Sequence, residues 1–332
     1  MPGSGATRAR TQEAIIPNDE LSLCIDIGKS GSRGRLAGRG ADILAAFAGL
    51  EPETAARSGA GERLLDVVHG IWRAALQQAD GDRITAASLR TIVVGSTSIP
   101  PRDEVALVLE GAARSWPYAR VLLVEDGILG HAAALGGPGN YVSVGTGVVG
   151  YGLDMSGAWF RKDGWGPDLG DRGSAAWLGR EGLAAALRAA DRAGPATALQ
   201  RAAGEHLGGL DHAAAARLAG RADRVAAVAA FARAVCAAAD GDEVARTLVA
   251  AAAEQVAATA RALVADTGID AVAVGGRLAG EAAYSAALDV ALATAGVRRL
   301  SVEVSPWEVA ADVLFGPAYA AVAAGMSEGS AS

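Results

Sequence analysis

The sequence predicts an α/β protein that is built from two related domains. Short apolar runs typical of buried parallel strands recur along the chain, and apolar residues at helical spacing follow several of them. Two units of strand, glycine turn and returning strand begin at residues 21 and 141, and each precedes further strands and helices. A length of 332 residues provides enough material for two hydrophobic cores.

Strand and helix patterns alternate through the first part of the chain. Leu64, Val68 and Leu76 belong to a set of apolar residues at helical spacing, which predicts the first helix. The expected elements are a hairpin at 21–36, a strand at 41–46, a loop at 51–61, a helix at 62–79, a strand at 89–94 and a helix at 104–115.

A carboxylate follows the apolar strand that we expect at residues 121–124. This strand ends at Glu125-Asp126-Gly127, and open α/β sheets bind their ligands at the carboxyl ends of strands. The plain alternative for Asp126 is a helix cap or a turn residue. Its position before a glycine, and between two candidate phosphate turns, favours a catalytic role.

Two glycine turns are candidates for binding an anion. Residues 27–32 join the strands of the first hairpin, and Gly145-Thr146-Gly147 joins a strand at 141–144 to its return at 148–151. Glycine lets backbone N–H groups approach an anion closely. Each turn alone also fits an ordinary hairpin. Both turns together, with an acid-tipped strand between them, are what a two-lobed nucleotide clamp needs.

The second part of the chain opens with a glycine-rich loop and is then mostly helical. Residues 164–174 hold four glycines, a tryptophan and acidic residues, and Ser174 is expected to cap the helix that follows. An ordinary capping loop is the alternative. The remaining expected elements are helices over 175–267 with breaks near 194–195, 208–209 and 240–241, a strand at 270–274, a helix at 281–295, a strand at 299–304 and a helix at 309–324.

Composition and charge argue against several classes of protein. The net charge is −7 and no basic patch is interleaved with aromatic residues, so we expect no nucleic-acid partner. Cys24 and Cys236 stand in apolar surroundings and are expected to be reduced, as in a cytoplasmic protein. Residues 1–20 lack the apolar run of a secretory signal and are expected to form a disordered tail. Residues 130–153 lack charges, but their glycines and Pro138 argue against a membrane span.

The order of these motifs resembles the actin-like ATPase superfamily of sugar kinases. Within it, the chain is most similar to the N-acetylglucosamine kinase branch, which is grouped with the BadF/BadG/BcrA/BcrD ATPases. Residues 26–33 resemble the first phosphate loop, D-G-G-G-T-x-T-R, but have Ile27 and Lys29 in place of glycines. Glu125-Asp126-Gly127 resembles T-D-A, the segment of the catalytic aspartate.

Three further motifs extend the resemblance over residues 21–325. Residues 143–147 resemble the second phosphate loop, S-G-T-G, and residues 274–276 resemble the glycine motif on the adenosine side. Residues 164–174 resemble G-G-W-G…G-D-E-G-S, the most specific match, with Arg172 in place of the glutamate. Each motif alone is weak, whereas five in order are a specific signal.

The resemblance implies a fold and an activity. It implies an α/β fold of two actin-like (ribonuclease H-like) domains with a nucleotide and substrate cleft between them. Domain I would comprise residues 21–127 plus 306–326, and domain II residues 128–305 with a helical insertion. The implied activity is ATP- and Mg²⁺-dependent phosphorylation of an amino sugar by a cytoplasmic enzyme. The partner would be a small-molecule sugar, with no membrane partner, and a homodimer is an option.

The resemblance also implies the roles of individual residues. Asp126 would be the general base, and Asp26 would hold Mg²⁺ through water. Arg33 and Lys29 would add positive charge at the phosphates, although Lys29 fits a solvent-facing position equally well. Phosphate or nucleotide contacts would come from the turn and motif residues Gly28, Lys29, Ser30, Ser32, Arg33, Gly145, Thr146, Gly147, Gly275 and Gly276. Sugar contacts would come from Ser96, Thr97, Gly164, Trp165 and Asp171.

Two other functions and the identity of the sugar stay open at this stage. One alternative is an ATPase activator of the BadF type, but neither Cys24 nor Cys236 looks like a ligand of an iron–sulfur cluster. The other is a nucleotide-dependent regulatory protein. Residues 50–61 hold no asparagine to read the sugar, and Arg172 departs from the motif, so the N-acetyl preference is open. Glucosamine, another amino sugar and a muramic derivative are the options.

Overall fold

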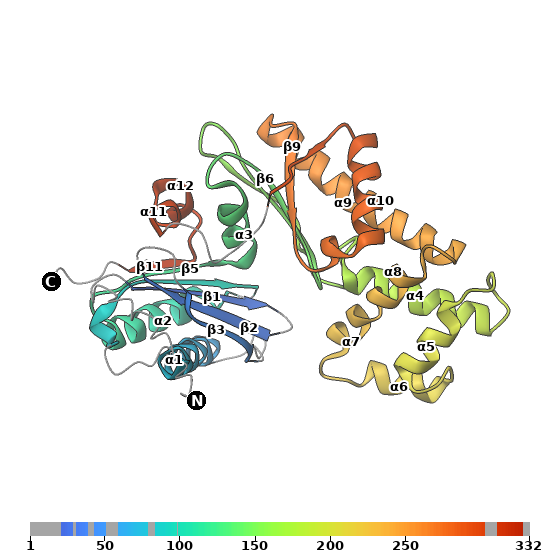
Figure 1. The fold of residues 1–332 in the computed structure, drawn as a ribbon, viewed down its shortest axis with the longest axis horizontal. Coiled ribbons are helices and arrows are strands. Elements are labelled where there is room, and N and C mark those ends of the chain that lie inside the picture. The colour runs from blue at the N-terminus through green and yellow to red at the C-terminus, as the bar shows by residue number, and fades with distance from the viewer. Residues whose placement is uncertain are drawn as a thin grey trace, which may run out of the picture.

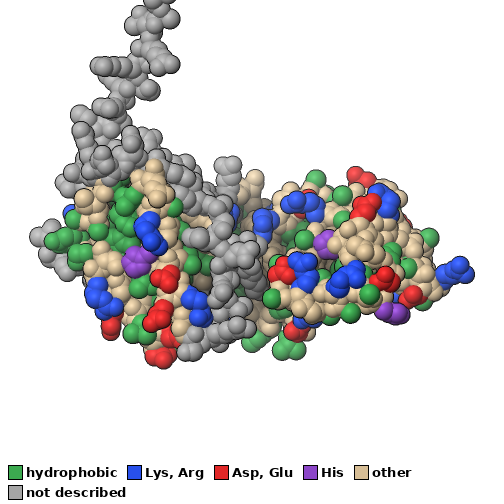
Figure 2. Space-filling model, turned by 90° about the horizontal axis from the view of Figure 1, so that it is seen from below, with side chains coloured by type: hydrophobic (Ala, Val, Ile, Leu, Met, Phe, Trp, Pro, Cys, Tyr) green, Lys and Arg blue, Asp and Glu red, His purple; other side chains and the backbone are tan. Residues whose placement is uncertain are grey.

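Two β-sheets with flanking helices form two lobes that lie side by side (Figure 1). The structure is a computed structural model, and it describes residues 21–28, 31–38, 43–50, 59–78, 84–97, 99–302 and 311–327. The expectations of a tail at 1–20 and of roles for Lys29 and Ser30 lie outside the described residues. On the face in Figure 2, acidic and basic side chains are interspersed over both lobes.

The first lobe contains a sheet of six strands. Its strands are β1 (Leu21–Gly28), β2 (Gly31–Ala37), β3 (Ile43–Leu50), β4 (Leu89–Ser96), β5 (Arg120–Glu125) and β11 (Gly325–Ser327). They lie in the order β11-β5-β4-β1-β2-β3. Strands β1, β4 and β5 run parallel, so their carboxyl ends meet at one edge of the sheet.

Helices cover both faces of this sheet. On one face, α1 (Ala60–Gln78) and α2 (Arg102–Ser115) enclose a core that includes Ile25, Trp72 and Trp116. On the other face lie α3 (Asp126–Leu135), α11 (Ala311–Leu314) and α12 (Pro317–Ala320), as Figure 1 shows. Alternate residues of β1 are buried, which is the pattern of a strand with one face more deeply covered.

The second lobe contains a sheet of five strands and most of the helices. Its strands are β6 (Gly139–Val144), β7 (Val148–Leu153), β8 (Trp159–Asp163), β9 (Ala271–Gly275) and β10 (Arg298–Arg299), in the order β10-β9-β6-β7-β8. Its helices are α4 (Ala175–Ala190), α5 (Leu199–Leu207), α6 (His212–Ala219), α7 (Arg224–Ala230), α8 (Ala232–Ala238), α9 (Glu243–Thr267) and α10 (Ala282–Thr294). The predicted breaks in the helical region separate α4 from α5, α5 from α6, and α8 from α9.

Helix α3 is the main element that we did not predict. Its glycines lower helix propensity, and the segment is short. The same glycines are needed for packing, because a Cβ at Gly127 would overlap the ring of Tyr151, and one at Gly130 would lie 2.6 Å from the hydroxyl of Tyr141. Helix α3 therefore lies against β6 and β7 and connects the two lobes.

Other boundaries differ from the prediction at the edges of the sheets. Strand β8 was not predicted, and the strand expected at 41–46 is β3, shifted toward the carboxyl end. The expected helix at 309–324 is, in its described part, the short helices α11 and α12, which Phe315 and Gly316 separate. Strand β11 follows them. Of the strand expected at 299–304, residues 299–302 are described, and of these only Arg299 belongs to a strand, β10 at Arg298–Arg299.

Among the described residues, α9 alone is long and apolar enough to cross a membrane by length and composition. Core helices pass the same test. Val249, Val256 and Leu263 of α9 are buried in the core of the second lobe.

Candidate active site

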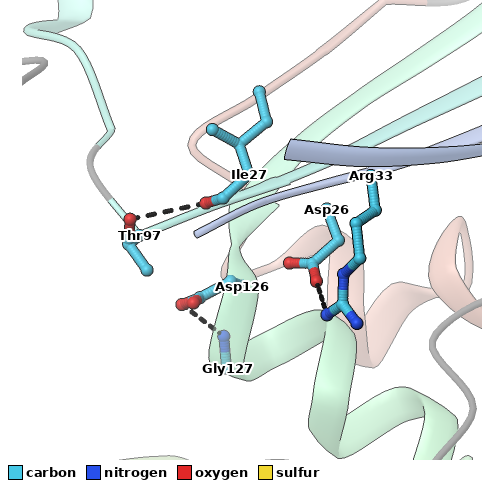
Figure 3. A network of polar contacts seen from close by, with 6 residues as sticks. All are labelled: Asp26, Ile27, Arg33, Thr97, Asp126 and Gly127. Carbon is cyan, nitrogen blue, oxygen red and sulfur yellow. Dashed lines mark hydrogen bonds and ion pairs between the residues drawn. The ribbon is translucent and has the colours of Figure 1, made fainter. Parts of the chain in front are cut away.

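The carboxyl ends of β1, β4 and β5 bring four predicted site residues to one edge of the first sheet. The register places Asp26 beside Gly95, and Ser96 beside both Ile27 and Glu125. The N–H group of Thr97 donates to the carbonyl oxygen of Ile27 at 2.9 Å. Asp26, Thr97 and Asp126 therefore stand at three adjacent strand ends (Figure 3).

Asp126 is the first residue of α3. Its Oδ1 accepts a hydrogen bond from the N–H group of Gly127 at 2.8 Å (Figure 3), which orients the carboxylate. The positive end of the α3 dipole favours a negative charge there. Gly95 lets the helix come this close, because a Cβ would lie 2.8 Å from the Leu129 side chain and 3.4 Å from the Cα of Asp126.

Asp26 forms an ion pair with Arg33 across the first hairpin. The two residues are partners in the β1–β2 register, and a guanidinium nitrogen of Arg33 lies 2.5 Å from Oδ2 of Asp26. Gly28 and Gly31 close the described part of the hairpin, and Ser32 is buried. The positive charge near Asp26 therefore comes from Arg33, whereas the contribution predicted for Lys29 lies outside the described residues.

The second glycine turn is tied to the start of α4. The N–H group of Gly145 donates to the carbonyl of Gly147 at 2.9 Å, which closes the turn. Ala175 and Ala176 then donate their N–H groups to the carbonyls of Gly145 and Thr146 at 2.9 and 3.1 Å. Ser174 caps α4, as predicted, by accepting from the N–H group of Trp177.

Asp171 lies directly against this turn. A Cβ at Gly147 would be 2.6 Å from Oδ2 of Asp171, so a predicted phosphate turn and a predicted sugar-binding acid are in contact. Asp171 is 3% exposed and has a φ of 51°, a left-handed conformation that is uncommon for a residue other than glycine. The loop around Asp171 must hold it in that conformation.

Asp163, which the sequence analysis did not select, stabilises this backbone conformation of Asp171. Its Oδ1 accepts from the N–H group of Asp171 at 2.8 Å, and its Oδ2 accepts from that of Arg172 at 3.2 Å. Asp163 ends β8 and is 8% exposed. The sequence did contain a signal for this role, because Asp163 is an acidic residue directly before the glycine-rich loop.

The loop between these two acids exposes an aromatic side chain. Gly164 has a φ of 72°, and the Trp165 side chain that follows is 69% exposed. Arg180 of α4 donates to the carbonyl of Pro167 at 3.2 Å and so holds the loop against the helix. Trp165 is thus available to a ligand, although the described contacts do not place its ring against Asp126.

Gly275 ends β9 and Gly276 follows it, at the edge of the second sheet where β6 leads into the Gly145–Gly147 turn. Gly275 pairs with Ser143, two residues before the Gly145 turn. A Cβ at Gly275 would lie 2.5 Å from the Tyr141 hydroxyl. Gly276 has a φ of 102°, and a Cβ there would overlap the carbonyl oxygen of Val144. Both positions therefore require glycine for packing, whether or not a nucleotide lies beside them.

Besides burial, the charges of Asp26 and Asp126, at strand ends of the first sheet, raise the pKa of Tyr141 in the second sheet. A hydrogen bond with Ser143 lowers this pKa. The contact of Gly127 with the ring of Tyr151, in β7, places the predicted base Asp126 where the two sheets meet.

The site suits a cation that binds few protein groups. Among the described residues, no group of three or more His, Cys, Asp or Glu side chains could hold a metal ion. Mg²⁺ commonly uses one or two carboxylates, with waters and substrate phosphates as the other ligands. A carboxylate at Asp26, at a strand end beside the glycine turn, fits that requirement.

Comparisons with known proteins identify a family for the chain and proteins of similar fold. A model of the BadF/BadG/BcrA/BcrD ATPase family matches residues 25–311. The fold is similar to that of a candidate N-acetylglucosamine kinase from Chromobacterium violaceum, with TM-score 0.71, 26% identity, and 87% of this chain and 97% of that chain covered. A candidate N-acetylglucosamine kinase from Porphyromonas gingivalis gives TM-score 0.68 at 20% identity, with 86% and 95% covered. A ROK family glucokinase from Streptomyces griseus gives TM-score 0.54 at 15% identity, with 86% and 95% covered. No curated protein sequence matches the chain.

Proposed function

Because the chain belongs to the BadF/BadG/BcrA/BcrD ATPase family, we propose that it transfers the terminal phosphoryl group of ATP to a hydroxyl group of an amino sugar. The two-lobed α/β fold of sugar kinases, which the motifs predicted, is present. One observation carries the proposal: Asp126 stands directly after β5, where the two sheets meet, and Asp26 lies near the carboxyl end of β1, two strands away in the same sheet.

In this proposal, Asp126 takes the proton from the sugar hydroxyl as that oxygen attacks the terminal phosphorus of ATP. The hydrogen bond from the Gly127 N–H group to Oδ1 would hold the Asp126 carboxylate in place while it accepts the proton. The bond between phosphorus and the bridging oxygen of ADP then breaks. Phosphoryl transfer depends mainly on positioning and on charge neutralisation, so one base and well-placed donors suffice.

The remaining residues hold the two substrates. Bound Mg²⁺, near Asp26, would neutralise charge on the phosphates. The first turn (Gly28, Lys29, Ser30, Ser32 and Arg33) and the second turn (Gly145 to Gly147) would hold the phosphates, and Gly275 and Gly276 would lie beside the nucleoside. Asp171 would hydrogen-bond sugar hydroxyls, and Ser96, Thr97, Gly164 and Trp165 would complete the sugar site.

The organisation of the chain is part of the same proposal. Domain I would comprise residues 21–127 and 306–326, and domain II residues 128–305. In support, β11 pairs with β5, so the described carboxyl-terminal residues return to the first sheet. We propose a cytoplasmic location and a small-molecule substrate, with a homodimer as an option.

The kinase is favoured over an activator that holds an iron–sulfur cluster between cysteines. Burial raises the pKa of Cys24 to about 12, and the nearby charge of Asp26 adds to this effect. Burial also raises the pKa of Cys236 to about 12. Thiolates are the form that binds iron, and both sites disfavour them.

The experiment that tests the proposal is ADP release with Mg²⁺ and ATP across a panel of sugars. The panel contains glucosamine, N-acetylglucosamine, N-acetylmannosamine, N-acetylmuramic acid and glucose. We expect one amino sugar to stimulate ADP release strongly. Nucleotide binding without stimulation by any sugar would contradict the kinase and favour a regulatory ATPase.

A further inference from the structure

Asp126 lies between two residues that both contact Tyr151. The Tyr151 hydroxyl donates a hydrogen bond to Oε2 of Glu125. On the other side, Gly127 lies so close to the Tyr151 ring that a Cβ would overlap it. One aromatic side chain therefore contacts the residue on each side of the proposed base, the Glu125 side chain and the Gly127 backbone.

Arg161 extends this contact to the sugar loop. Its guanidinium lies 3.6 Å from Oε2 of Glu125 and donates to the carbonyl of Gly164 at 3.5 Å. The Arg161 and Glu125 side chains are 48% and 40% exposed, so solvent screens their ion pair. Tyr151 is 5% exposed, and its hydrogen bond is therefore the firmer of the two links.

These contacts join the two lobes. Glu125 ends β5 of the first sheet, whereas Tyr151 belongs to β7 and Arg161 to β8 of the second. Strand β7 begins directly after the Gly145–Gly147 turn, and Tyr151 is the fourth residue of this strand. A strand is a stiff connection, so the position of Tyr151 relates that turn to Asp126.

We propose that Tyr151 is a positioning residue, which acts with Glu125 and Arg161 to fix the Asp126 carboxylate relative to the second glycine turn. This inference rests on the proposed kinase function and names a feature that the motifs did not contain. Tyr151 does not act as a base itself. Burial, followed by the charge of Glu125 and the hydrogen bond with it, raises its pKa, so the phenol stays protonated and donates.

The test compares three variants with a matched control. Tyr151→Phe removes the hydrogen bond but keeps the ring, Tyr151→Leu removes both, and Glu125→Gln removes the charge. The control, Tyr319→Phe, also removes a phenol hydroxyl that is buried and hydrogen-bonded, in this case to His131. We measure kcat, both KM values, the thermal midpoint, and amide hydrogen exchange of the peptide that contains residues 125–127.

We expect Tyr151→Phe to lower kcat by about 10- to 100-fold, since a small displacement of a reacting group has effects of this size, while both KM values change less than about threefold. Tyr151→Leu should lower kcat further. Combining Tyr151→Phe with Glu125→Gln should be no worse than the poorer single variant, because the pair acts as a unit. Amide exchange at 125–127 should rise in Tyr151→Phe and stay at the wild-type level in Tyr319→Phe.

The exchange measurement needs no sugar, so it separates failure of this inference from failure of the proposed function. Unchanged exchange at 125–127 in Tyr151→Phe would overturn the positioning role, whatever the activity. An inactive wild-type protein with the expected change in exchange would instead overturn the kinase and retain the structural link. An equal loss of kcat in Tyr319→Phe would reduce the effect to a general loss of stability, and would also overturn the inference.

Discussion

Asp163 holds Asp171 in a left-handed backbone conformation through a hydrogen bond of 2.8 Å from the Asp171 N–H group. A second bond, from the N–H group of Arg172, occupies the other carboxylate oxygen. The acid that we propose to bind the sugar thus depends on a second acid for its backbone conformation.

Replacing Asp163 with Asn should weaken sugar binding. The side-chain amide of the Asn would direct its NH₂ group at one of the two backbone N–H groups, those of Asp171 and Arg172, so one hydrogen bond to the Asp163 carboxylate would be lost. Loss of a hydrogen bond to a charged group typically costs about 1.5–3 kcal/mol. The sugar KM should therefore rise about 10- to 100-fold, with a smaller change in the KM for ATP. Asp168→Asn is the control, because that side chain is 82% exposed. Equal changes in the two KM values would contradict the assignment of this loop to the sugar.

Asp126→Asn should retain nucleotide binding and lose most turnover. A general base typically contributes about 10²- to 10⁴-fold, and the amide cannot accept the proton. Steady-state kcat and calorimetric binding of ATP measure the two properties separately. Asp103→Asn, in the first turn of α2, is the matched control. A near-normal kcat in Asp126→Asn would remove this residue from the role of base.

Arg33→Met should change the Mg²⁺ dependence of the reaction. The guanidinium partly neutralises Asp26, and its removal should lower the Mg²⁺ concentration for half-maximal rate by about two- to fivefold, the range of a partly exposed ion pair. Arg114→Met, which breaks the exposed pair with Glu110, should have no such effect. A raised KM for ATP at unchanged Mg²⁺ dependence would contradict the effect on Asp26 and would leave Arg33 with its proposed phosphate contact alone.

His131 should make the fold sensitive to acid. Burial lowers its pKa from 6.5 to about 4. Because the folded value lies below the unfolded one, the neutral ring favours folding above pH 6.5, and about 3 kcal/mol of this contribution is lost as the pH falls from 6.5 towards 4. Urea unfolding at several pH values should show a flatter dependence in His131→Phe than in the wild type. The exposed His212→Gln should keep the wild-type slope.

Gly276→Ala should destabilise the fold by at least about 2 kcal/mol, since it combines an unfavourable φ with overlap at the Val144 carbonyl. Gly280→Ala is the matched control, because a Cβ there meets no atom within 4 Å. It should change stability by no more than about 0.5 kcal/mol. Equal midpoints of urea unfolding for the two variants would contradict the packing role of Gly276.

Sequence patterns predicted the strand ends of this fold better than its connections. Asp26, Asp126 and the Gly145–Gly147 turn follow apolar strands, and parallel pairing brings such ends together, so local pattern and topology agree. Helix α3 was missed because its reason is tertiary. Gly127 and Gly130 are poor for a helix in isolation, yet they alone let it approach Tyr151 and Tyr141.

The supporting residues were harder to predict than the motif residues. Asp163 hydrogen-bonds the backbone N–H groups of residues 171 and 172, whereas Tyr151 hydrogen-bonds the side chain of Glu125, and neither contact leaves a fixed spacing in a sequence. Tyr151 also acts across two sheets, on residues 125 and 127. The Tyr151 contact becomes visible only when the packing of one sheet against the other is known.

The pairing of β11 with β5 has a consequence for synthesis. Gly325 pairs with Leu123, which precedes it by about 200 residues, so at 5–20 residues per second the partner strand is made about 10–40 s later. During that interval the apolar edge of β5 can pair with other chains. A ribosome-bound chain that ends before residue 325 should therefore need protection by chaperones, and the strand that leads to Asp126 would be among the last to acquire both of its neighbours.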